Sequence, residues 1–294
     1  MEQQSIAIIA GQLSVGGAER QLHLWLSHLD RARFAPVVVT IHPGCGDYWE
    51  PEVNRLGIPL LRVARGGSRV GRLMKIVRVL RPHRPRLIHG WHLFASGYAG
   101  AAAKLVGANA SLASTRGSYR AYRAQRAEAF LAKLLTDAML VNSRATAMRL
   151  GENGGRPRRI FVVPNAVEDV AEPRDAARTR LANRWRIPTD HLWIGSAGRF
   201  QRSKRFDQLL EVAARLSSAG NRIHVLLIGY GDLESELRGQ AARLGIASSV
   251  TFTGEDPTAR SWMSALDVFC FPSEDEGLPN VVLEASAAGV PVVA

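Results

Sequence analysis

The strongest constraint on the fold is a repeated order in which a short apolar segment is followed by a loop and then by an amphipathic helix. Apolar segments of strand length recur along the whole chain, at 5–10, 36–41, 58–63, 86–89, 139–142, 160–165, 192–198, 224–229, 250–254 and 268–271. Helical periodicity between them is clearest at 18–29, 70–80, 95–106, 176–185 and 206–216. Strands that alternate with helices predict parallel sheets. The expected fold is α/β, with two Rossmann-like, doubly wound parallel-sheet domains.

A chain of 294 residues is long enough for two domains that each have a core. We place an N-terminal domain at 1–168, a linker with a small helix at 169–190, and a C-terminal domain at 191–294. Two such domains facing each other would bind ligands in a cleft at the carboxyl ends of their strands. The glycine-containing loops of this sequence follow predicted strands and are therefore expected at that edge.

The positive charge of the chain, +12 overall, is unevenly distributed. Residues 1–165 hold 24 of the 38 Lys and Arg residues but only 9 of the 26 acidic ones, whereas residues 166–294 hold 14 basic and 17 acidic residues. A basic N-terminal half is expected to meet an anionic partner, such as a membrane surface, an anionic substrate or nucleic acid. Arginines interleave with tyrosines from Arg116 to Arg126, but no nucleic-acid-binding signature accompanies them, so nucleic acid is unlikely.

Nothing in the sequence indicates a membrane span or a secreted protein. No apolar run has the length of a membrane span, and the N-terminal residues lead directly into a strand rather than into a signal peptide. Cys45 and Cys270 are too few and too distant to suggest a disulfide framework. We expect a cytoplasmic location, and the basic helix at 70–80 leaves open a peripheral position at the inner face of the membrane.

The most informative stretch is 271–294, where an apolar strand opens into a polar loop and a short helix follows. Glu276 lies in the loop and Glu284 lies in the helix, eight positions later. A strand–loop–helix unit directs backbone N–H groups and the positive end of a helix dipole at whatever occupies the loop. This suits a phosphate or a sugar hydroxyl, although two glutamates in such a unit can also be simply solvated or capping residues.

The complete stretch resembles the donor-site signature of retaining GT-B glycosyltransferases of family 4. The resemblance rests on Glu276-x7-Glu284, on Gly277 directly after the first glutamate, and on the closing Glu-Ala-x-Ala-x-Gly-x-Pro-Val-Val. In that family the second glutamate binds the ribose of a nucleotide-sugar and the first faces the transferred sugar. The resemblance implies these roles for Glu284 and Glu276. It also implies that family members continue beyond Ala294, so we expect the second domain to be incomplete.

Two further segments support the resemblance. Gly198-Arg199-x4-Lys204, at the end of a predicted strand, resembles the family's phosphate-binding pair, and two cations there could neutralise a diphosphate leaving group. Gly16-Gly17-Ala18-Glu19 resembles the family's N-terminal loop, which faces the donor phosphates. The predicted donor-binding residues are Gly17, Arg199, Lys204, Gly277, Leu278 and Glu284.

The predicted catalytic residues are Glu276, Arg199, Lys204 and His92. The resemblance implies retention at the anomeric carbon, with the departing phosphate helping to deprotonate the acceptor and Glu276 positioning the sugar. His92 follows a strand where family members often place a histidine, but Trp91 could take that position, and a lone histidine is often structural. No Asp-x-Asp and no cluster with metal-ligand spacing occurs, so we expect no metal and no cofactor besides the nucleoside-diphosphate sugar as donor.

The sequence therefore predicts a glycosyltransferase of the hexosyltransferase type. It would move a sugar from a nucleoside diphosphate to a glycan or lipid-linked acceptor bound by the basic N-terminal domain. Two alternatives stay open. A nucleotide-sugar epimerase can share the two-domain architecture, although no acid–base pair for it is recognisable. A non-catalytic nucleotide-sugar-binding protein, or an inactive fragment of such an enzyme, would keep the donor site without turnover.

Overall fold

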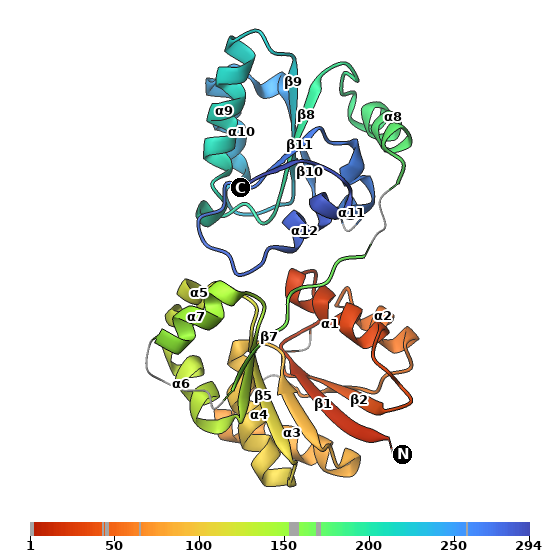
Figure 1. Ribbon diagram of the computed structural model, residues 1–294, viewed down its shortest axis with the longest axis vertical. Helices are drawn as coiled ribbons and strands as arrows, with labels where there is room; N and C mark the ends of the chain where they lie inside the picture. The colour runs from red at the N-terminus through yellow and green to blue at the C-terminus, as the bar shows by residue number, and fades with distance from the viewer. Residues whose placement is uncertain are drawn as a thin grey trace. The chain divides into compact units, whose positions relative to one another are not determined.

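The computed structural model describes residues 3–42, 44, 47–64, 66–152, 159–168, 172–256 and 258–294. The chain divides into two compact units, Met1–Asn165 and Ala166–Ala294. Each unit has a central sheet with helices packed against it (Figure 1). The paired strands in both sheets are parallel. The predicted α/β class with two doubly wound sheets is confirmed, and the second sheet is the smaller.

The first unit contains a seven-stranded sheet in the order β3-β2-β1-β4-β5-β6-β7. The chain runs outward from β1 to β3, crosses back, and runs outward again from β4 to β7, which is the Rossmann arrangement. The strands are β1 Gln4–Ala10, β2 Phe34–Thr40, β3 Leu60–Arg62, β4 Leu87–Gly90, β5 Ala110–Thr115, β6 Ala138–Val141 and β7 Ile160–Val162. The helices are α1 Gly17–Ser27, α2 Glu50–Arg55, α3 Arg69–Leu80, α4 Leu93–Val106, α5 Tyr119–Ala124, α6 Arg126–Leu135 and α7 Arg144–Glu152.

Burial and capping explain the elements that the sequence predicts well. Residues 7–10 of β1 have no exposed surface, as expected for a central parallel strand that is covered on both faces. Helix α3 begins after Ser68, whose Oγ accepts a hydrogen bond of 3.0 Å from the Gly71 N–H. The helix predicted at 70–80 is confirmed to within one residue because its cap and its apolar stripe agree.

Strand β5 is the element of the first sheet that the sequence does not predict. Its residues, ASLAST, are small or hydroxylated, whereas strands are usually rich in β-branched and aromatic residues. The strand forms because β4 and β6 pair with it on either side. Its end places Arg116 at the carboxyl edge of the sheet.

The second unit contains a five-stranded sheet in the order β10-β9-β8-β11-β12. This repeats the winding of the first sheet, outward from β8 to β10 and then outward from β11. The strands are β8 Leu192–Ala197, β9 Ile223–Ile228, β10 Val250–Gly254, β11 Val268–Cys270 and β12 Val292–Val293. The helices are α8 Arg174–Trp185, α9 Phe206–Ser218, α10 Glu234–Arg243, α11 Ala259–Trp262 and α12 Asn280–Ala287.

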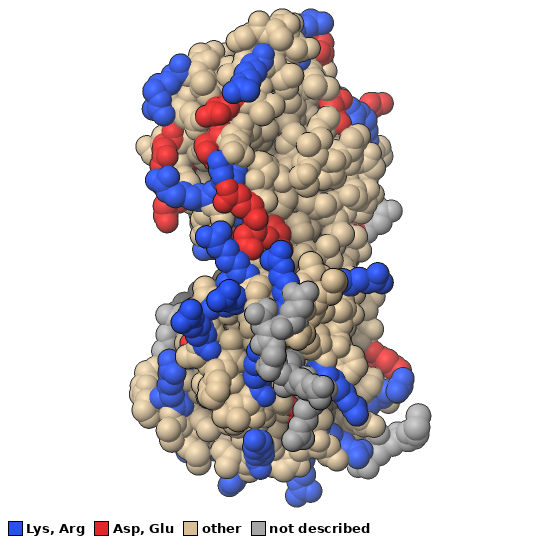
Figure 2. All heavy atoms as spheres, turned by 60° about the vertical axis from the view of Figure 1, so that its left-hand side comes forward, with Lys and Arg blue, Asp and Glu red and all other residues tan. Residues whose placement is uncertain are grey.

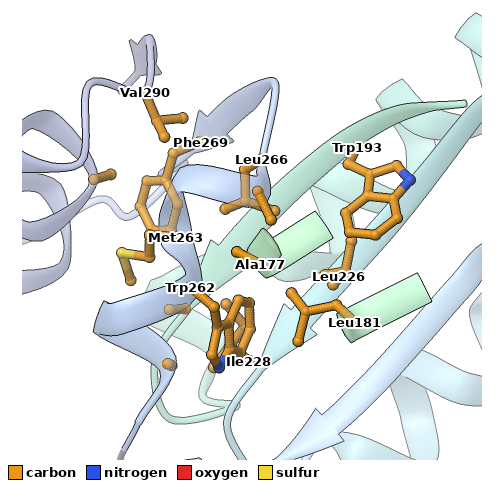
Figure 3. Close-up of a cluster of buried hydrophobic side chains, with 14 of the residues drawn as sticks. Ala177, Leu181, Trp193, Leu226, Ile228, Trp262, Met263, Leu266, Phe269 and Val290 are labelled. Carbon is orange, nitrogen blue, oxygen red and sulfur yellow. The ribbon is translucent and has the colours of Figure 1, made fainter. Parts of the chain in front are cut away.

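The segment 169–190, which we predicted as a linker with a small helix, contains helix α8. Its Ala177 and Leu181 have no exposed surface and pack in a core cluster of the second unit with Trp193 and Trp262 (Figure 3). The described part of the segment from 172 onward is therefore part of the second unit rather than a linker; residues 169–171 lie outside the described residues. The sequence misleads here because a charged helix with few apolar positions still buries the small face that it has.

No helix in the described ranges is both long enough and apolar enough to cross a membrane. Of the two cysteines, Cys45 lies outside the described residues. Cys270, at the end of β11, is half-buried, and this burial raises the pKa of its thiol.

A carboxylate ties α8 to the sheet of the second unit. Asp267, just before β11, accepts hydrogen bonds from the Trp193 N–H at 2.7 Å and from Arg178 Nη1 at 3.0 Å, and it also pairs with Arg174. Burial alone would raise the pKa of Asp267, but these hydrogen bonds outweigh it and hold the pKa below its usual range. Only the ionised carboxylate can accept all three.

We predict that Asp267→Asn destabilises the second unit by about 1–3 kcal/mol near neutral pH, because the two arginines lose their anionic acceptor. A group whose folded-state pKa is depressed stabilises the fold above its unfolded pKa of about 4, and this stabilisation is lost as the pH falls toward the folded-state value. The difference in thermal midpoint between wild type and variant should therefore narrow from about pH 7 to about pH 2.

The control is Asp190→Asn, which removes an exposed ion pair with Arg222 and should change the midpoint little. A difference between wild type and Asp267→Asn that stays constant over the whole pH range would contradict this account of Asp267.

Candidate functional site

Two loops at the carboxyl edge of the second sheet are held together through their backbones. Gly229, after β9, has a φ of 137°, and a Cβ there would lie 2.0 Å from Gly198 O, so only glycine fits. Gly198 and Phe200, after β8, donate backbone hydrogen bonds of 2.9 and 2.8 Å to the end of β9 and its loop. Arg199 lies between these two anchored residues, so its backbone is fixed at the strand end.

The structure brings together Lys204 and Glu276, which are 72 residues apart in the sequence. Lys204 ends a 3-10 turn at Arg202–Lys204, and its Nζ donates to Glu276 Oε1. Ser273 Oγ donates to the same carboxylate oxygen at 2.7 Å, and the Lys204 Nζ also lies 5.3 Å from the centre of the Phe271 ring. Both side chains of the ion pair are about one-quarter exposed (23% and 25%), so the pair is reachable from solvent and yet fixed.

The loop after β11 is also anchored to the 3-10 turn by residues that no sequence motif predicts. The Glu274 N–H donates to Ser203 O at 3.0 Å, and Ser273 Oγ lies 3.2 Å from the same oxygen. Arg205 pairs with the Glu274 carboxylate. The polar residues after β11 are visible in the sequence as candidates for such contacts, but the sequence does not reveal their partners, which lie on a separate loop. These contacts fix the position of Glu276 relative to Lys204.

Arg199 is exposed and makes no ion pair with a carboxylate of the described residues. Its guanidinium carbon lies 5.7 Å from the centre of the Tyr230 ring, and its Nη2 lies 3.5 Å from Tyr230 Oη. The side chain is therefore oriented by an aromatic neighbour but keeps its charge available. Such a cation can bind an anionic ligand without first breaking a salt bridge.

The remaining predicted donor residues of this unit surround the start of α12. Gly277 and Leu278 are half-buried and directly precede the helix, for which Pro279 is the N-cap residue. Glu284 lies in the second turn of α12 and is 9% exposed. Gly289 follows the helix with a φ of 72°, the left-handed conformation that glycine commonly adopts just after the end of a helix. The helix thus presents its N-terminal N–H groups next to the loop that carries Glu276.

In the first unit, His92 joins the loop after β4 to the loop after β1. The Gly11 N–H donates to His92 Nδ1 at 3.2 Å, so the ring proton belongs on Nε2, which lies 3.3 Å from Glu19 Oε1. Glu19 belongs to the first turn of α1, the helix that begins at Gly17. Both ring nitrogens are therefore engaged inside the unit. No pattern in the sequence predicts this role for the Glu19 carboxylate, because its partner comes from a distant loop.

Trp91, the alternative to His92 at this position, is buried in the first unit. Its side chain is 1% exposed, and its Nε1 donates to Ala18 O at 2.8 Å. The turn between β4 and α4 is tight, since a Cβ at Gly90 would lie 2.5 Å from Ser96 Cα. Trp91 is directed into the core, whereas His92 caps α4 and stays partly exposed.

Among the described residues, no group of three or more His, Cys, Asp or Glu side chains could hold a metal ion. At the carboxyl edge of the second sheet, Lys204 pairs with Glu276 and Arg205 pairs with Glu274.

A pair of doubly wound parallel-sheet units is the architecture of the GT-B class of glycosyltransferases, and solved structures of that class match this fold. The crystal structure of Anabaena HepE in complex with UDP and glucose superposes with a TM-score of 0.85, at 20% identity, over 99% of this chain and 80% of that one. The chain belongs to glycosyltransferase family 4. The model described as Glycosyltransferase Family 4 matches residues 15–170, and the one described as Glycosyl transferases group 1 matches residues 177–294.

Relatives with similar sequences are also named as glycosyltransferases. The putative glycosyltransferase EpsF of Bacillus subtilis is 33% identical over 172 residues, which are 55% of this chain and 45% of that protein. The lipopolysaccharide core biosynthesis glycosyltransferase LpsE of Rhizobium meliloti is 32% identical over 160 residues, 54% of this chain and 44% of that protein. The matches thus span less than half of the length of these relatives.

We predict that Lys204→Ala and Arg199→Ala weaken the binding of nucleoside diphosphates by about 10–100-fold, because each removes a charge-assisted hydrogen bond. Glu284→Ala should weaken binding of the free nucleoside as well, because its predicted partner is the ribose. Isothermal titration with UDP, GDP and ADP, and with the matching nucleosides, measures both effects.

Arg202→Ala is the matched control, since Arg202 belongs to the same turn but its side chain is 83% exposed and its Nη2 lies 3.7 Å from Glu236 Oε2. The site assignment fails if Arg199→Ala, Lys204→Ala and Glu284→Ala all bind nucleotides as tightly as the wild type does.

Proposed function

We propose that the protein transfers a sugar from a nucleoside-diphosphate sugar to a glycan or lipid-linked acceptor, with retention of configuration and without a metal ion or cofactor. The observation that carries this proposal is the Lys204–Glu276 pair at the carboxyl edge of the second sheet, close in sequence to Arg199, a cation that makes no ion pair with any described carboxylate. Membership in glycosyltransferase family 4 supports it, as does the nucleotide-sugar bound by the structural relative HepE.

In the proposed reaction, the bond between the anomeric carbon and the diphosphate breaks while a bond to the acceptor oxygen forms on the same face. Lys204 and Arg199 would neutralise the charge that develops on the leaving diphosphate, which is the task that Mg²⁺ performs in other transferases. The acceptor proton would pass to the departing phosphate. The reaction then needs no base from the protein.

Glu276 would position the transferred sugar and stabilise the positive charge that develops at the anomeric carbon of this sugar. Its Oε1 already accepts hydrogen bonds from Lys204 and from Ser273, and these bonds withdraw electron density from the carboxylate. A carboxylate held in this way is a poor nucleophile, which fits a reaction without a covalent sugar–enzyme intermediate.

The first test is the release of nucleoside diphosphate from UDP-, GDP- and ADP-sugars, with and without a pool of glycan and lipid-linked acceptors. We expect release that depends on one donor and on an acceptor, that persists in EDTA, and that falls by about 10²-fold or more in Glu276→Gln. Tight donor binding with no turnover for any acceptor would favour a nucleotide-sugar-binding protein. Conversion of the donor into its epimer without release would favour an epimerase.

We further propose that the first unit holds its acceptor next to an anionic surface, at the cytoplasmic face of a membrane. Many Lys and Arg side chains and few acidic ones lie on the face of residues 1–165 shown in the lower half of Figure 2. On α3, Lys75 and Arg78 are exposed beside two exposed apolar side chains, Val70 (68%) and Met74 (52%). Cations interleaved with exposed apolar groups are typical of helices that lie in a membrane interface.

The combined change Lys75→Glu and Arg78→Glu should abolish co-sedimentation with vesicles that contain phosphatidylglycerol, because it reverses two charges on this face. The matched control, Arg215→Glu with Arg243→Glu, makes the same charge change on exposed residues of the second unit and should leave sedimentation unchanged. Equal sedimentation with neutral phosphatidylcholine vesicles would contradict the electrostatic proposal.

A further inference from the structure

Four polar or aromatic residues meet at the carboxyl edge of the first sheet without belonging to the site described above. Trp91 follows β4, Arg116 follows β5, Asn142 follows β6, and Asn165 comes soon after β7. Parallel strands deliver their carboxyl ends to one edge, which is where ligands bind in folds of this kind. Arg116 is the centre of the group, because the other three all contact it.

The guanidinium of Arg116 is held by neutral partners. Its central carbon lies 4.1 Å from the centre of the Trp91 ring, and its Nη1 donates to Asn165 Oδ1 at 2.9 Å. The Arg116 carbonyl accepts a hydrogen bond of 2.8 Å from Asn142 Nδ2. The plane of the side chain is therefore fixed from two sides, by a ring and by an amide.

Arg116 has no anionic counterpart in the part of the chain that the structure describes. No described carboxylate pairs with it, and its Nε is buried without a hydrogen-bond acceptor. The Oδ1 of Asn142 is likewise buried and unpaired. Burial lowers the pKa of Arg116 to about 10, so the side chain still carries its charge at neutral pH.

The charge of Arg116 also acts on its neighbour His89. Burial, and to a smaller extent the Arg116 charge, lower the pKa of His89 to about 3, so this histidine is neutral. His89 Nε2 lies 2.5 Å from Ser114 Oγ and supplies no negative charge. The described contacts of Arg116 are with neutral groups, and a mostly buried cation among neutral groups is costly for the folded protein unless an anion pairs with it.

We propose that Arg116 binds an anionic group of the acceptor, a phosphate or a carboxylate, at the carboxyl edge of the first sheet. The planar guanidinium, pre-oriented on Trp91, matches the two oxygens that either group presents. The assignment to the acceptor rests on the proposed function, in which Arg199 and Lys204 of the second unit take the donor diphosphate. The anion site itself is independent of turnover and can be tested separately.

The test measures the thermal midpoint of the protein, saturated with its nucleoside diphosphate, as inorganic phosphate or glucuronate is added at constant ionic strength. A ligand that binds the folded state raises the midpoint by mass action. We expect such a rise for the wild type, and an affinity that is about 10-fold or more weaker in Arg116→Gln. Arg123→Gln removes an exposed arginine of the same basic stretch and should respond as the wild type does.

The two added anions distinguish the sources of the charge. A response to phosphate indicates a phosphorylated acceptor, and a response to glucuronate indicates an acidic sugar. Arg116→Lys keeps the charge but loses the fork of donors, so it should bind more weakly than the wild type even if Arg116→Gln fails to fold. The proposal is overturned if neither anion shifts the nucleotide-saturated wild type, or if Arg116→Lys binds as tightly as the wild type does.

The anion site at Arg116 and the proposed transferase activity can fail independently of each other. A protein that binds phosphate through Arg116 but turns over no donor would retain the anion site and lose the transferase assignment. A protein that turns over its donor but ignores both anions would retain the transferase assignment and lose the role of Arg116.

Discussion

Parallel pairing of the strands is the constraint on which the rest of the structure depends. Each crossover returns the chain to the edge of the sheet where the strands begin. The carboxyl ends of neighbouring strands therefore meet at the opposite edge. In the second unit this edge collects the loops after β8, β9 and β11, and in the first unit it collects the loops after β1, β4, β5, β6 and β7. Residues such as Lys204 and Glu276 meet only because of this arrangement.

The cations at the carboxyl edge have different surroundings in the two units. In the second unit, Lys204 and Arg205 each pair with a glutamate of the loop after β11, so their geometry is set by the protein itself. In the first unit, Arg116 is surrounded by an aromatic ring and neutral amides. A paired cation can support a catalytic carboxylate, whereas a cation without its own anion is suited to an anion that arrives with a ligand.

The sequence predicts the site better than it predicts the segments that support it. The signature from Glu276 to Glu284 and the pair Arg199 and Lys204 are local patterns. The structure places Arg199 and Lys204 in the segment after β8, Glu276 in the loop after β11 and Glu284 in α12, although their roles stay predictions. Strand β5 was missed because ASLAST lacks strand-forming residues. The helix at 176–185 was predicted, but its packing into the second unit was not, because its buried face is small. The strand and this packing depend on neighbours that are distant in the sequence.

The sequence by itself determined the α/β class, the two doubly wound sheets and the family, because periodicity, turn glycines and short motifs are local properties of the chain. Only the tertiary structure decided that Ser273 and Lys204 share one oxygen of Glu276, that Glu19 engages His92, and that no carboxylate among the described residues pairs with Arg116. Each of these facts is a distance between separate loops. Such distances follow from the strand order and from side-chain packing, which no spacing along the chain records.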